Sequence, residues 1–103
     1  MSEKVFDVDT LYEDADRTIA LVTLQGVGAR VRNLRSATSY HVVSGHGYFF
    51  RKFPNTGQLF DKKVGPGDVV HIPAGTEYQD SGDLVMLATS TPAFDSSDVE
   101  VLG

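Results

Sequence analysis

The alternation of apolar and polar residues predicts β-strands along most of this chain. Residues 19–24 and 84–89 are apolar at both odd and even positions, which is typical of strands that are covered on each side. Strand-like composition also occurs at residues 38–43, 48–53, 58–64 and 69–72. No stretch of the sequence sustains the period of an amphipathic helix. The pattern therefore indicates an all-β protein.

Turn sequences separate the expected strands. Glycine, proline, asparagine and aspartate favour chain reversals, because they supply positive φ, a fixed φ or local hydrogen bonds. They gather at residues 45–47, 54–57, 65–68, 73–75 and 80–83. Short strands with closely spaced turns predict an antiparallel sandwich or barrel.

Two segments before residue 38, residues 1–16 and 27–34, have a weaker pattern. Thr10 and Glu13 fit a capping box, so we expect one short helical turn in an otherwise irregular stretch at residues 1–16. A strand within residues 27–34 would carry Arg30 and Arg32 on one face, since side chains two residues apart share a face of a strand.

Composition limits the class of protein. The 103 residues suit a single domain, residues 1–103, with its core at about residues 18–95, and 41% of them are apolar, which is enough to build a core. There is no cysteine, so disulfides and thiolate metal sites are absent. The net charge of −5 argues against binding to nucleic acid or to an anionic membrane. The polar N-terminus and the lack of a long apolar run predict a cytoplasmic location.

Residues 64–78 combine a turn, a short apolar strand, a second turn and the start of another strand. Gly67, Pro73 and Gly75 have the spacing of the second cupin motif, which reads Gly, five residues, Pro, one residue, Gly, two residues, His; Tyr78 stands at the histidine position. Residues 40–47 resemble the end of the first cupin motif, a strand that runs into Gly-x-Gly. The resemblance to cupins implies a single-domain, jelly-roll-like antiparallel β-barrel.

The same resemblance shows which residues stand where cupins hold their metal. Thr38 occupies the position of the family's glutamate, and its histidine pair falls on Arg32 and Leu34, or on Arg30 and Arg32 if the loop is two residues longer. The usual metal ligands are therefore missing, and we expect neither a metal nor another cofactor.

A metal site built from other residues stays open as an alternative. Zinc and iron sites usually take three or four ligands, often with closely spaced histidines. The histidines here are His41, His46 and His71, and the first two are five residues apart across an expected turn. Relocated ligands such as His41, His71 and Glu77 would be the candidates.

The expected barrel suggests a ligand site at its mouth. By resemblance, Thr38, Tyr40 and Tyr78 point into the barrel, and an arginine joins them. The expected ligand-binding residues are Arg30, Arg32, Thr38, Tyr40 and Tyr78. Arginine grips carboxylate or phosphate with two parallel hydrogen bonds, whereas phenols and hydroxyls orient sugars.

These residues predict a metal-independent, small-molecule-binding cupin that takes an anionic or polyhydroxylated ligand. One alternative is an isomerase, epimerase or lyase acting on a sugar or keto acid, either metal-free or with a relocated metal; its proton-transfer candidates are Tyr40, Tyr78, Glu77 and His71. Another is a structural role for a filled barrel. Small cupins commonly pair, so the resemblance also implies a homodimer, through residues 5–8 or 19–24.

Overall fold

The computed structural model describes residues 6–54 and 56–102. This part of the chain forms eight strands and one short 3-10 helix. In order they are β1 (Phe6–Glu13), β2 (Thr18–Val27), β3 (Val31–Asn33), β4 (Ala37–Lys52), β5 (Leu59–Val64), β6 (Val69–Ile72), β7 (Glu77–Thr91), η1 (Ser96–Asp98) and β8 (Val99–Val101). All strand pairs are antiparallel. The all-β, barrel-like architecture expected from the sequence is confirmed.

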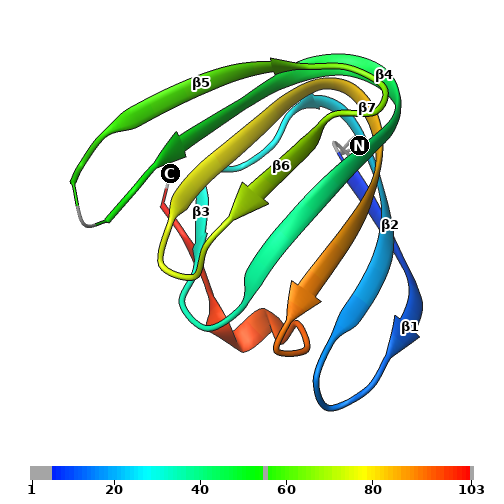
Figure 1. Ribbon diagram of the computed structural model, residues 1–103, viewed down its shortest axis with the longest axis vertical. Helices are drawn as coiled ribbons and strands as arrows, with labels where there is room; N and C mark the ends of the chain where they lie inside the picture. The colour runs from blue at the N-terminus through cyan, green and yellow to red at the C-terminus, as the bar shows by residue number, and fades with distance from the viewer. Residues whose placement is uncertain (1–5, 55, 103) are drawn as a thin grey trace, which may run out of the picture.

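Two long strands, β4 and β7, pair along their whole length and curl over together at one end of the molecule (Figure 1). The first half of β4 also pairs with β6 and its second half with β5. The second half of β7 pairs with β2, which in turn pairs with β1, whereas the start of β7 pairs with β3 and, through it, β8. Because both long strands bend, one part of each lies in one wall of the barrel and the other part lies in the opposite wall.

The turns expected at residues 45–47 and 80–83 are wrong, because β4 continues through the first segment and β7 continues through the second. The glycines there produce bends instead of reversals. Gly45 and Gly82 have φ values of 88° and 117°, a region that suits glycine alone, and the β4–β7 register shifts between Val42 and Ser44. The expected hairpin around residue 54 is confirmed, since β4 and β5 pair across it.

The helical turn expected at Thr10–Glu13 is also wrong, since these residues belong to β1. Pairing with the edge of β2 satisfies the backbone groups of β1 that face β2 along nearly the whole strand, whereas one isolated helical turn would satisfy few backbone groups. Residue 27 ends β2, and Arg30 lies in the connection to β3. No helix in the described ranges has the length and apolar character needed to cross a membrane.

The barrel is filled at one end and open at the other. Near the bends, large side chains meet between the walls and are almost fully buried: Leu24, Phe49, Val64, Val70, Leu84 and Met86. Farther along β2 and β7 the inward positions carry small side chains: Ala20 pairs with Ala88, and Thr18 pairs with Ser90. Because small side chains do not fill the space between the walls, the open end contains a cavity.

Candidate functional site

The cavity at the open end, here called the barrel cavity, has a volume of about 300 Å³. That volume is at the lower end of the range for small-molecule sites. Its walls are mostly apolar, and seven lining residues carry side-chain oxygen atoms. The lining residues are Val8, Thr10, Thr18, Ala20, Val22, Ala29, Val31, Thr38, Tyr40, Tyr78, Asp80, Ala88, Ser90, Phe94 and Val99.

Tyr40 and Tyr78, here called the tyrosine pair, place two phenol groups at the cavity. Their Oη atoms are 3.0 Å apart and share a hydrogen bond. The Tyr40 ring also packs on Phe49, with 5.2 Å between ring centroids, which anchors the pair to the filled end of the barrel. Burial raises the pKa of both phenols, so both are protonated at neutral pH. Since each phenol has one O–H and only one is used between them, the pair retains one donor for a ligand.

Thr38 and Ser90 form a second polar contact on the cavity wall. Their hydroxyl oxygens are 2.9 Å apart, and both residues are buried. The contact follows from the strand register, because Thr38 of β4 lies opposite Ser90 of β7. Here too one hydroxyl proton remains available to a bound molecule.

Asp80 is the acidic residue of the barrel cavity. It lies two residues after Tyr78 on β7, so the two side chains share the inner face of the wall. Burial raises the pKa of its carboxyl group. Of the residues that the structure describes, no lysine, arginine or histidine lines the cavity. The cavity therefore combines hydroxyl donors with one carboxyl group in an apolar enclosure.

Arg30 and Arg32 do not line the barrel cavity. The guanidinium group of Arg32 binds the carboxylate of Glu100, with an N–O distance of 3.2 Å. Arg30 lies 3.5 Å from the carboxylate of Glu77, and its guanidinium carbon is 4.7 Å from the centre of the Phe50 ring. The reason is strand alternation: the neighbouring Val31 faces the cavity, so Arg32 faces the opposite side of β3.

The structure thus brings together three of the five expected ligand-binding residues, Thr38, Tyr40 and Tyr78, and keeps the two arginines outside. It adds Asp80 and Ser90, which sequence reasoning missed. Ser90 continues the inward alternation of the last strand expected in the sequence. Asp80 was not expected to face the cavity, because its segment, residues 80–83, has the composition of a turn.

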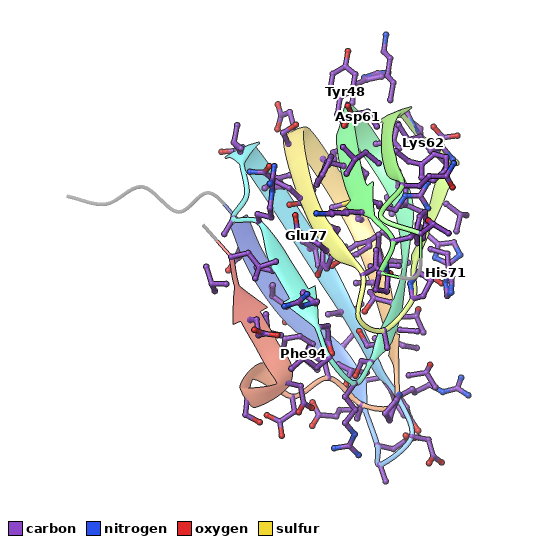
Figure 2. All side chains as sticks on the ribbon, turned by 90° about the vertical axis from the view of Figure 1, so that its left-hand side faces the viewer. Tyr48, Asp61, Lys62, His71, Glu77 and Phe94 are labelled. Atoms are coloured by element: carbon purple, nitrogen blue, oxygen red, sulfur yellow. The ribbon has the colours of Figure 1, made fainter. Side chains whose placement is uncertain are left out.

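The three histidines are separated on the outer surface. His41, His46 and His71 are all exposed, and His71 lies on the outside of the barrel wall (Figure 2), where its Nδ1 atom is 3.0 Å from the hydroxyl of Ser39. Glu77 faces Arg30 instead of a histidine. Within residues 6–54 and 56–102, no three His, Cys, Asp or Glu side chains gather closely enough to hold a metal ion.

Known structures resemble the fold of this chain closely. A variant of Streptomyces PAC13 solved with uridine matches with a TM-score of 0.85 and 24% identity, covering 100% of this chain and 82% of that chain. KdgF from Halomonas sp. matches with a TM-score of 0.78 and 19% identity, over 92% of this chain and 86% of that chain. A mutant of Bacillus subtilis oxalate decarboxylase matches with a TM-score of 0.81 and 20% identity, over 99% of this chain and 29% of that chain.

Comparisons at the level of sequence gave no match, either to a protein-family model or to a curated protein. The structural matches extend over nearly the whole chain, and the proteins matched have cupin barrels. The chain therefore has the cupin fold.

Proposed function

We propose that this protein binds a small, hydroxyl-bearing organic molecule without negative charge in the barrel cavity. The observation that carries the proposal is the tyrosine pair, which offers a phenol donor inside an apolar cavity of about 300 Å³. Thr38 and Ser90 add a second hydroxyl donor. Such a combination of apolar walls and a few polar groups is typical of ligand sites. Of the two ligand types expected from the sequence, the polyhydroxylated one is favoured, because the described residues that line the cavity include no cation to hold an anion.

Uridine is the first ligand to test. It is uncharged at neutral pH and carries several hydroxyl groups, and PAC13, which shares the fold, has been solved with uridine. Binding of uridine by wild-type protein, measured by isothermal titration calorimetry, is the direct test of the proposal. Wild-type protein that binds neither uridine nor simple neutral sugars would contradict it.

Tyr78→Phe is expected to weaken uridine binding roughly 10-fold, because a ligand hydrogen bond to a buried group is lost while the ring that fills the wall stays in place. Calorimetry on both proteins measures the change. Tyr48→Phe is the matched control, since Tyr48 is exposed on the outer face of β4 and does not line the cavity. An equal loss of affinity in both variants would remove the tyrosine pair from the binding site.

A catalytic role is the second candidate, and one observation favours it. The tyrosine pair and the Asp80 carboxyl, all with raised pKa values, line the same enclosure and could give and take protons. Pac13 is described as a nucleoside dehydratase, so a lyase acting on a nucleoside-like substrate is the form to test. Turnover that disappears in Tyr78→Phe and survives a chelator would support metal-free catalysis. Turnover that a chelator abolishes and one metal restores would support relocated metal ligands.

We also propose that two copies of the chain pair through the outer faces of β2 and β7. Four apolar residues lie side by side there: Ile19, Leu21, Val85 and Leu87. They are only partly buried, because the described chain places no further layer over them. An apolar face of this kind suits a second copy of the same chain. The residues of β2 belong to the 19–24 segment expected to pair; of the 5–8 segment, residue 5 lies outside the described residues.

Leu87→Asp is expected to convert the dimer to a monomer, because two charged side chains would be buried in the interface. Sedimentation velocity at micromolar concentration measures the change. Val101→Asp is the control, since Val101 is exposed on β8 in the other wall. Wild-type protein that sediments as a monomer would contradict the pairing.

A further inference from the structure

The position of Asp80 is set by a close contact between β7 and the loop that follows β2. The backbone N–H of Gly28 donates to the carbonyl of Asp80 over 2.9 Å, and the side-chain amide of Gln79 donates to the carbonyl of Gly28 over 2.8 Å. A Cβ atom on Gly28 would lie only 2.4 Å from Oδ1 of Asp80. The absence of a side chain at this glycine therefore makes room for the carboxyl group on the cavity wall.

Among the residues that the structure describes, no cation lies beside the Asp80 carboxyl group. The ion pairs found among the described residues are Arg30–Glu77 and Arg32–Glu100, and neither lies in the cavity lining. The side chains that line the cavity with it are neutral. When ionised, Asp80 thus gives the cavity a negative potential that no neighbouring side chain cancels. In an apolar enclosure, this potential acts more strongly than it would in water.

We propose that Asp80 selects the ligand by charge. It accepts hydrogen bonds from an ammonium or other donor group of the ligand, and it excludes ligands that bear a carboxylate or phosphate. The ligand class is then a neutral or amine-bearing sugar or nucleoside, not a sugar acid or nucleotide. This inference rests on the proposed function of the barrel cavity, and it adds the specificity that the hydroxyl groups alone do not provide.

Three probes of nearly equal size test this selection. They are uridine, the analogue in which an amine replaces the primary hydroxyl of the ribose, and the analogue in which that carbon is a carboxylate. Affinities are measured by calorimetry at neutral pH for the wild type, Asp80→Asn and Asp83→Asn. Asp83 is the matched control, since it is an exposed aspartate on the same strand and outside the cavity lining.

Wild-type protein is expected to bind the amine at least 10-fold more tightly than the carboxylate, by the combined effect of attraction and repulsion. Asp80→Asn should reduce this ratio to below 3-fold, and Asp83→Asn should preserve it. Uridine binding by wild type without any preference between the two charged analogues would overturn the inference and leave the proposed function standing. Failure of all three probes, and of simple neutral sugars, to bind would overturn the proposed function itself.

The pH dependence of the wild type gives a second measurement that needs no variant. Burial raises the pKa of Asp80, so the carboxyl gains its proton at a higher pH than an exposed aspartate does. The preference for the amine over uridine should therefore fall as the pH is lowered through this raised pKa, while the amine itself stays charged. A preference that is constant down to the ordinary pKa of aspartate would contradict the role of Asp80.

Discussion

Replacing Gly82 with alanine is expected to lower the free energy of unfolding by roughly 4 kcal/mol, the sum of backbone strain and a clash between strands. Gly82 has a φ of 117°, and a Cβ atom there would lie 2.5 Å from the Cα of Gly47 and 2.6 Å from the carbonyl oxygen of His46. These are backbone atoms, which cannot rotate away as a side chain can. Small domains are stable by only about 5–15 kcal/mol, so this substitution would remove a large part of the free energy of unfolding.

Gly67→Ala separates the two causes. Gly67 has a φ of 90°, but a Cβ atom there would meet nothing within 4 Å. Gly67→Ala should therefore lower the free energy of unfolding only by the cost of the backbone strain, about 1–2 kcal/mol. Denaturant unfolding of both variants measures the difference. Equal losses in the two variants would show that the close approach of β4 and β7 does not limit the fold.

Ala88→Leu is expected to weaken uridine binding roughly 100-fold, at the upper end of the penalty for placing extra methyl groups in occupied space. Ala88 lies on the cavity wall opposite Tyr40 and beside Ala20. The added groups would take space in the cavity that the ligand needs. In the free protein the same groups enter a hollow, so the midpoint of thermal unfolding should stay the same or rise.

Thr89→Leu is the control for that variant. Thr89 is the next residue of β7 and faces the outside of the wall, so this variant places the same leucine side chain on the opposite face of the strand. It should leave uridine binding unchanged. Binding that survives Ala88→Leu in a folded protein would place the ligand outside the barrel cavity.

Local signals in the sequence identify three of the polar residues that line the barrel cavity. Alternation along one strand puts Thr38 and Tyr40 on the same face, and the cupin spacing puts Tyr78 inward; the structure places all three at the cavity. Arg30 and Arg32 were expected at the same site from an assumed register of residues 29–38. That register depends on the pairing of β3 with β7 and β8, which are distant in sequence, and it turns Arg32 toward Glu100.

Glycine has two uses in this chain, and the sequence does not distinguish them. At Gly57 it closes a hairpin, whereas at Gly82 it lets a strand continue through a bend while another strand lies close against it. The difference is decided by the partner strand, because β4 and β7 pair on both sides of the bend. Asp80 was therefore read as part of a turn, although it lies on an inward face.

The sequence by itself determined the class of fold, the hairpin and the absence of the usual cupin ligands at the matched positions. These depend on residue type, period-two alternation and spacing, which are local properties. The tertiary structure decided that the open end is hollow, that the phenols of Tyr40 and Tyr78 meet, and that Asp80 faces the cavity with no cation near it in the described part of the chain. Those features depend on which strands pair and in what register, and thus on contacts between residues that lie far apart in the chain.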